Sequence, residues 1–375
     1  MKRLYKSILC LALVATVSMS FTSCMDETEP TDEATTKQIE KSSSAAQALL
    51  MAMPAYFNNA SQFTSWIDDD GNHFPFGYGA IMYIRDLMTG DLGHSTKSYG
   101  SHFNAWAQNK YMGDGYRKTQ YVWNYYYGFV QTTNNMIEGV NEANATDTQL
   151  GYLGAGYAFR AMLYLDMARM YEFLPNDKTS SKNSDGNDVL NLTVPIVKAG
   201  MSQEDDRNNT RVSREKMAEF ILGDLDQAEK YIVKLTDTKG TTLPNLACVY
   251  GLKARLYMWI EDYPNAQKYA RLAINASTVQ PISQEAALNT TTGFNTASEF
   301  MWASQLTKED YTVSTGIVNW VSWLSNQTAF GYTGSSTGLY NLVDAKMYGR
   351  ISNTDWRKLE FKAPDASTLA SKISY

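Results

Sequence analysis

Few residues in this chain have the types and spacing that catalysis or metal binding requires. Its three histidines, His73, His94 and His102, show no H-E-x-x-H or other zinc-ligand spacing. Two turns, DDDGN at 68–72 and NSDGND at 183–188, offer oxygen ligands and a glycine that could hold Ca²⁺, but neither has a glutamate at the twelfth position. We therefore interpret these turns as solvated surface and expect no cofactor, no metal and no catalytic residue. A structural calcium ion at the turns is left open.

The thiol with the clearest chemical role is Cys24, which follows a segment with the layout of an export signal. A basic N-terminus precedes an apolar core from Ile8 to Val17, and SFTSC then leads to Cys24. The core has about ten residues, whereas a membrane-spanning helix needs roughly 20. The Ser-Cys pair resembles the lipobox of bacterial lipoproteins, with Phe21 where leucine is usual. We expect 1–23 to be a lipoprotein signal peptide and Cys24 to carry the lipid (palmitate); the alternative is a plain secreted protein.

The residues after Cys24 are polar and acidic. Asp26, Glu27 and Glu29 begin a flexible tether over 24–38. An acidic run at this place resembles the surface-export signal of Bacteroidetes lipoproteins, and implies an outer-membrane, surface-exposed location. The formal net charge of −6 would become −9 without the signal, so nucleic acid is a poor partner. Cys248 would be the only thiol left unmodified, so we expect no disulfide.

Helical periodicity dominates the middle of the chain. The expected helices cover 39–56, 83–88, 116–141 and 152–173, and another begins after Ser213. Two regions, about 57–115 and 305–375, have no clear period and are rich in Gly, Asn, Trp and Tyr. We expect long irregular loops there.

The most informative segment is LACVYGLKARLYMWIEDYPNAQKYARLAI, within 245–276. Ala254, Tyr257, Ala266 and Ala273 match the small and aromatic positions of a tetratricopeptide-like helix pair. The segment departs from that pattern at Ala270, where an aromatic residue is usual. Small residues allow two antiparallel helices to approach closely. The alternative is a coincidental helical hairpin.

A second, interrupted unit lies upstream. Ala161 and Tyr164 repeat the same spacing, and DLDQAEKYI at 224–232 repeats the second helix. An insertion at 174–211 separates them, and its length suggests a functional loop or a docking surface. We therefore predict a mainly all-α domain over 39–375, with tetratricopeptide-like helices at about 116–276.

The order of these features resembles the SusD/RagB family of nutrient-binding lipoproteins of Bacteroidetes. The resemblance rests on FRAMLYLDMARMYEFLP, VSREKMAEFILGDLDQAEKYI, ARLYMWIEDYPNAQKYARLAI and SEFMWASQ, and covers most of residues 24–360. It implies a right-handed superhelical scaffold of tetratricopeptide-like helix pairs with glycan-binding loops on one face. It also implies a partner, a SusC-like TonB-dependent transporter in the outer membrane, which the lipoprotein caps.

The resemblance implies sugar binding by aromatic rings and amides in two loop segments, SHFNAWAQNKYMGDGY and YTVSTGIVNWVSWLSNQTAFGY. An aromatic plane covers the apolar C–H face of a pyranose, and amides bond its hydroxyls. We single out Trp106 and Trp320. The other candidates are Asn104, Tyr111, Tyr311, Asn319, Trp323 and Tyr332. Three tryptophans on or beside periodic segments are predicted to be core residues: Trp123, Trp259 and Trp302.

The leading function is therefore surface capture of oligosaccharides or other nutrients and their transfer to the transporter, with no enzyme activity. One alternative is an all-helical glycoside hydrolase, which would need two carboxylates about 5–10 Å apart. A second is a helical-repeat adaptor without a ligand. Members of the family are usually longer, so the resemblance implies that a C-terminal part is missing after NTDWRK, either in a fragment or in a short form.

Overall fold

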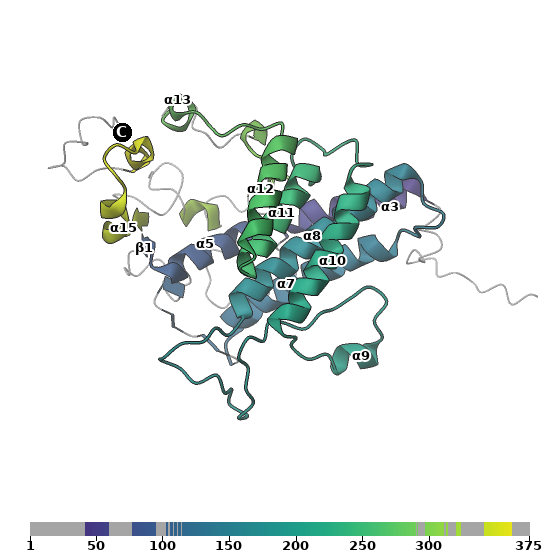
Figure 1. Cartoon of the computed structure of the whole chain (residues 1–375), viewed down its shortest axis with the longest axis horizontal. Coiled ribbons are helices and arrows are strands. Elements are labelled where there is room, and N and C mark those ends of the chain that lie inside the picture. Colours follow the sequence, from purple (N-terminus) through teal and green to yellow (C-terminus); the bar gives the residue numbers. More distant parts are fainter. Residues whose placement is uncertain are drawn as a thin grey trace, which may run out of the picture.

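The chain is mainly helical, as predicted (Figure 1). The computed structural model describes residues 42–59, 77–94, 103, 106–107, 109–110, 112–113, 115–289, 291, 297–310, 313, 320–323 and 341–361. The α-helices in these ranges are α3 (Ser43–Tyr56), α5 (Gly77–Thr89), α7 (Arg117–Glu138), α8 (Asp147–Tyr171), α9 (Gln203–Arg207), α10 (Arg214–Ile232), α11 (Leu246–Trp259), α12 (Tyr263–Ala276), α13 (Gln284–Ala287) and α15 (Ala345–Arg350). Three 3₁₀ helices, η3 (Ala297–Glu299), η5 (Trp320–Trp323) and η6 (Trp356–Glu360), and two strands, β1 (Leu92–His94) and β2 (Asn341–Val343), complete them.

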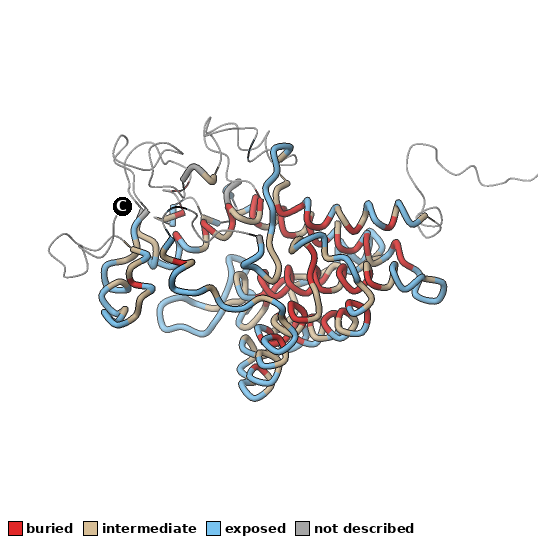
Figure 2. The backbone as a smooth tube through the Cα atoms, turned by 90° about the horizontal axis from the view of Figure 1, so that it is seen from above, coloured by how far each residue is buried: buried red, intermediate tan, exposed pale blue. Residues whose placement is uncertain are grey.

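Helix α8 is the centre of the bundle. It packs against α7, α10, α3 and α11, and α11 packs in turn against α12 (Figure 1). It begins five residues before the expected start, because Thr146 and Gln149 form a reciprocal capping box: Thr146 Oγ1 accepts from the Gln149 N–H, and Gln149 Oε1 accepts from the Thr146 N–H. Figure 2 shows that buried residues concentrate in this bundle and are sparse around α15.

Glycines set how closely α8 meets the end of α10. A methyl group at Gly154 would lie 2.6 Å from the backbone nitrogen of Ile232, and one at Gly151 would lie 2.7 Å from that of Leu235. Real side chains do not approach backbone so closely, so these two positions require glycine for the observed packing.

The predicted helix pair at 245–276 is present as α11 and α12. Ala254, Ala266 and Ala273 are buried, and Tyr257 stacks on Tyr269 across the pair with the rings 11° from parallel. In the upstream unit Ala161 and Tyr164 are also buried. Ser213 caps α10 as expected, accepting from the Lys216 N–H. The small and aromatic residues of the predicted pattern therefore pack between the helices of the bundle, as a tetratricopeptide-like helix pair requires.

The insertion at 174–211 is partly scaffold rather than only loop. Thr193 and Val194 are fully buried, and Tyr127 donates a hydrogen bond to the Pro195 carbonyl. Arg211 donates to the carbonyls of Tyr171, Leu192 and Thr193, so the returning end of the insertion is fastened to the end of α8. Of the segment, residues 175–191 are mostly exposed.

A short antiparallel pairing joins two distant parts of the chain. Leu92, Gly93 and His94 in β1 pair with Val343, Leu342 and Asn341 in β2. Figure 1 shows β1 beside α5 and near α15, at one end of the helical bundle. The N-terminal and C-terminal loop-rich regions therefore meet beside α5.

Candidate functional site

The two tryptophans that the sequence singled out lie in different surroundings. Trp106 has 4% of its surface exposed and belongs to the hydrophobic core. Its ring therefore presents no open face to a sugar. Trp320, at the start of η5, is half-buried and packs against the edge of that core. Of these two rings, only Trp320 is placed to receive a ligand.

The remaining candidates fall largely outside the described residues. Of Trp323 only the backbone is described, at the end of η5. Those outside are Cys24, Asn104, Tyr111, Tyr311, Asn319 and Tyr332. Trp123, Trp259 and Trp302, which were predicted to be core residues, are half-buried and pack against the buried cluster, as Trp320 does.

Trp320 packs against a glycine of α5, Gly79, which we call its seat. The six-membered ring of its indole lies directly against Gly79, so closely that a methyl group at position 79 would overlap it. Gly79 is the third residue of α5, and its lack of a side chain provides room for a flat ring on the helix surface. Sequence inspection missed Gly79, because its role depends on a residue far along the chain.

From Gly79 a line of half-buried residues continues along α5. Met82 and Arg85 follow at intervals of three residues, so each lies beside the one before it and the line winds round the helix from Gly79 to Arg85. The Arg85 guanidinium is 4.0 Å from the Met82 sulfur. The surface beside Trp320 thus passes from an indole to a thioether and then to a cation.

The same helix is tied to the bundle through Asp166 of α8, which is fully buried. Its Oδ2 accepts from the hydroxyl of Tyr78 at 2.5 Å and from that of Tyr126 at 3.4 Å. Its Oδ1 lies 3.3 Å from Arg255 of α11 and 3.7 Å from Arg85 of α5. One carboxylate therefore connects α5, α7, α8 and α11.

The two tyrosines are held as hydrogen-bond donors. Burial, and then the neighbouring Asp166 charge, raise the pKa of Tyr78 and Tyr126 well above the ordinary value. Both hydroxyls therefore stay protonated throughout the pH range in which proteins are folded. They offer no general base, and the cluster around Asp166 is suited to positioning groups rather than to proton transfer.

Comparison with known proteins agrees with this architecture, although no family model matches the chain. A SusD-like carbohydrate-binding protein of Bacteroides vulgatus superposes with a TM-score of 0.61 and 18% identity, over 84% of this chain and 60% of that one. SusD-superfamily proteins of Bacteroides thetaiotaomicron (TM-score 0.61, 18% identity, 84% and 63% covered) and Bacteroides fragilis (0.59, 17%, 88% and 70%) superpose similarly. The chain has the SusD-like fold.

Its sequence points the same way. The SusD-like protein P38 of Formosa agariphila is 29% identical over 150 residues, which are 40% of this chain and 25% of that protein. The chain thus matches about a quarter of the curated relative and spans about three fifths of the first two solved SusD-like structures. The predicted resemblance is confirmed at the level of fold and sequence similarity.

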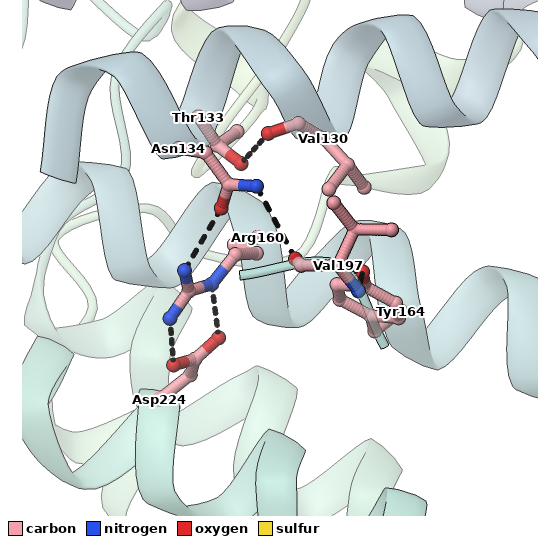
Figure 3. Close-up of polar contacts among 7 residues, drawn as sticks. All are labelled: Val130, Thr133, Asn134, Arg160, Tyr164, Val197 and Asp224. Atoms are coloured by element: carbon pink, nitrogen blue, oxygen red, sulfur yellow. Dashed lines mark hydrogen bonds and ion pairs between the residues drawn. The ribbon is translucent and has the colours of Figure 1, made fainter. Parts of the chain in front are cut away.

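A second buried polar cluster holds the SusD-like scaffold together. Arg160 of α8 donates to both oxygens of Asp224 in α10, at 2.8 and 2.7 Å, and to the Asn134 amide oxygen of α7 at 2.9 Å (Figure 3). Asn134 in turn donates to the Val197 carbonyl of the insertion. Burial raises the pKa of Asp224, and the hydrogen bond and charge of Arg160 oppose that shift. Arg160, Asp224 and Asn134 all have hydrogen-bond partners within the scaffold, so we interpret this cluster as structural.

No metal site is evident in the part of the chain that the structure describes. That part contains no group of three or more His, Cys, Asp or Glu side chains able to hold an ion. In the NSDGND turn the Asn183 side-chain oxygen accepts from the N–H groups of Asp185 and Asn187, so it caps the turn itself. The DDDGN turn, together with His73 and His102, lies outside the described residues.

Two further observations limit other functions. Among the described helices, none is long and apolar enough to cross a membrane. The segment GSSTG at 334–338 has the G-x-S-x-G spacing of a nucleophile elbow, but that motif requires a strand–turn–helix context and the segment is outside the described residues.

Sequence inspection missed the cluster around Asp166 and the neighbouring Met82. Met82, Arg85, Asp166 and Arg255 each lie on a periodic helix, where charged residues are usually interpreted as solvated surface. One available signal was Asp166 itself, an acidic residue in the middle of the apolar run MLYLDMARM. A carboxylate in such a run must find partners when it is buried.

Proposed function

We propose that this chain is a glycan- or nutrient-binding protein of the cell surface, with Trp320 as part of its ligand platform. The observation that carries the proposal is the seat of Trp320 on Gly79, in a chain with the SusD-like fold. A half-buried indole fixed on a helix offers a rigid apolar plane at low entropic cost. The C–H face of a pyranose complements such a plane.

The platform would work by binding alone. An aromatic plane and nearby hydrogen-bond donors retain a sugar without any change in its bonds, and Met82 and Arg85 extend the surface along α5. Under this proposal the amides Asn104 and Asn319 and the rings of Tyr111, Tyr311, Trp323 and Tyr332 contribute from the neighbouring loops. The protein is then not an enzyme.

The glycoside-hydrolase alternative has less support. Such an enzyme needs two carboxyl groups facing each other across an accessible cleft. Asp166, the buried carboxylate that contacts Arg85 of α5, is already engaged by two tyrosines and two arginines. Incubation with a retained polysaccharide should release no reducing sugar; release that disappears on mutation of a carboxylate would favour the hydrolase.

The platform is tested by affinity electrophoresis in gels that contain individual polysaccharides. We expect one of them to retard the wild-type chain, and Trp320→Ala to lose most of that retardation. Gly79→Ala should weaken it as well, because the added methyl group displaces the indole. The matched control is Trp123→Ala, which removes another half-buried tryptophan, packed on Tyr127 and Tyr171 of the bundle.

The control separates binding from general damage. Full retention by Trp320→Ala, with a glycan that retards the wild type, would remove Trp320 from the site. Loss of retention in Trp123→Ala to the same extent would show that the assay reports on folding rather than on contact with the ligand.

We also propose that lipid on Cys24 anchors the protein to the outer membrane, where it delivers its ligand to a SusC-like TonB-dependent transporter. The support is the signal-like N-terminus and the acidic run after Cys24. Several acyl chains hold a protein firmly, whereas one alone binds weakly. The lipoprotein is then a permanent component of the surface.

This part of the proposal has a separate test. Cys24→Ala should move the protein out of the membrane fraction. Replacing Asp26, Glu27 and Glu29 with Ala should keep the lipid but abolish cleavage by a protease added to whole cells. Unchanged cleavage in that triple variant would refute the role of the acidic run, and co-purification with a transporter tests the partner.

A further inference from the structure

Two arginines contact the buried Asp166, and a third lies three residues after it on α8. Arg255 of α11 has 47% of its side chain exposed, and Arg85 of α5 has 25%. Arg169, three residues after Asp166 on α8, is also exposed. Three guanidinium groups therefore lie at or beside one carboxylate, whose charge a single arginine would neutralise.

Arg169 lies on the side of α8 that meets α11. The acidic residue before it, Asp166, contacts Arg255, and the one after it, Glu172, accepts a hydrogen bond from Trp259 Nε1 at 2.9 Å. Positions three residues apart share one side of a helix. Arg169 and Arg255 thus project from neighbouring helices along the same seam.

Most of the donors of these arginines are unused. A guanidinium has five N–H donors. Arg255 makes one contact, to Asp166 Oδ1, and Arg85 contacts Asp166 and the Met82 sulfur. Within the described residues Arg169 forms no hydrogen bond or ion pair. Asp166 holds Arg255 in place through one nitrogen and leaves the remainder of its planar fork for a ligand.

The charged groups around this place include carboxylates as well as arginines. Asp86 is the carboxylate beside Arg85 on α5, and it is exposed; Glu172 already pairs with Arg214 at 3.6 Å. The tyrosine partners of Asp166 are neutral. Three arginines thus lie at or beside one buried carboxylate, whereas Asp86 and its neighbour Asp91 are exposed next to Arg85, in a chain whose formal net charge is −6. A local excess of donors is what an anionic ligand needs to approach an acidic protein.

We propose that Arg85, Arg169 and Arg255 bind the acidic group of the ligand, so that this protein takes oligosaccharides carrying a carboxylate or a sulfate ester. This inference rests on the proposed glycan-binding function. The planar fork of arginine matches the geometry of both oxyanions. Arg85 lies about 9 Å along the α5 axis from Gly79, the seat of Trp320, because six residues each rise 1.5 Å. Met82 lies between them on the helix surface and contacts Arg85, so an oligosaccharide that stacks on Trp320 and follows α5 past Met82 reaches the arginines.

The test compares polysaccharides that differ only in charge. Polygalacturonate and its fully methyl-esterified form share one backbone, and carrageenan against agarose provides the corresponding sulfate pair. We expect the full-length chain to bind one of the charged forms about tenfold more tightly than its neutral counterpart, since a hydrogen bond to a charged group contributes at least that factor. The preference should weaken in 0.5 M NaCl.

The variants are Arg255→Gln and Arg169→Gln, with Arg271→Gln as the matched control. Arg271 is exposed on α12 and makes no contact in the described part of the chain. The first two should lose the preference for the charged form, and the control should keep it. Arg169 forms no hydrogen bond or ion pair within the described residues, so its replacement should change stability little, and melting temperatures verify the fold of all three.

Two outcomes would overturn the inference in distinguishable ways. Equal retention of charged and neutral forms by the wild type would refute acidic recognition while leaving glycan binding intact. The same conclusion follows if Arg169→Gln and Arg255→Gln keep the preference. Failure of the wild type to bind any glycan, charged or neutral, would refute the proposed function and this inference together.

Discussion

The helical bundle at 115–276 and the region around Trp320 are built in different ways. In the bundle, long helices such as α8 begin with side-chain caps and bury a full set of core residues. Around Trp320, a four-residue 3₁₀ helix rests on a single glycine of α5, and a three-residue strand joins the two loop-rich regions. The bundle supplies rigidity, and the second region uses that rigidity to hold surface groups in place.

The largest expected effect concerns the bundle. Arg160→Met leaves Asp224 buried without its bidentate partner, and should lower the free energy of unfolding by about 3–5 kcal/mol. The double variant Arg160→Met, Asp224→Leu should recover most of this loss, because it removes the stranded carboxylate. Urea denaturation of the three proteins measures both steps. Equal losses in the single and double variants would contradict a role for the pair.

The same variant predicts a pH dependence. Burial already raises the pKa of Asp224, and without Arg160 the chief opposing effect is gone. A carboxyl with a raised pKa in the folded state favours folding at low pH and loses that contribution as the pH rises. The loss of unfolding free energy in Arg160→Met, relative to the wild type, should therefore become smaller as the pH falls from 8 to 5. A deficit that grows over this interval would be inconsistent with burial as the cause.

The two tryptophans sharpen the comparison further. Trp106→Ala removes a ring that is 4% exposed, and should cost about 3–5 kcal/mol of stability. Trp320→Ala should cost clearly less, because its ring is half-buried, while it removes glycan binding. Thermal unfolding and affinity electrophoresis of both variants provide the two readouts. If Trp320→Ala proves the more destabilising of the two, Trp320 is a core residue and not a platform.

Two glycines of the bundle, Gly154 and Gly223, should differ in how their replacement changes stability, by smaller amounts than the variants above. Gly154→Ala forces a methyl group against the backbone at Ile232 and should cost about 1–3 kcal/mol. Gly223→Ala, on an exposed side of α10 with no atom within 4 Å of the new methyl group, should instead stabilise by about 0.5–1 kcal/mol. Opposite shifts in melting temperature are expected. A gain for Gly154→Ala would mean that α8 and α10 can separate without cost.

The smallest effect concerns Cys248, which is 6% exposed at the start of α11. Burial raises the pKa of its thiol, so less thiolate is present at pH 8 than in an exposed cysteine. Labelling by a thiol reagent should be at least about tenfold slower in the native protein than in urea. Equal rates would show that the packing of α11 on its neighbours opens readily.

Part of this molecule follows from the sequence alone. The positions of α11 and α12, the cap at Ser213 and the burial of Ala161 and Tyr164 were all predicted. Each depends on residues within a few turns of one another, and helical periodicity and capping are local properties of the chain. The acidic net charge of the chain and its small number of cysteines are likewise matters of composition.

Only the tertiary structure decided which aromatic ring is buried and which keeps an exposed face. Trp106 and Trp320 stand in similar polar and aromatic surroundings in the sequence, yet one is core and the other rests on Gly79. The same holds for Asp166, whose partners Tyr78 and Arg255 lie 88 and 89 residues away. Burial and pairing at such separations depend on how whole helices pack, and no local pattern records that packing.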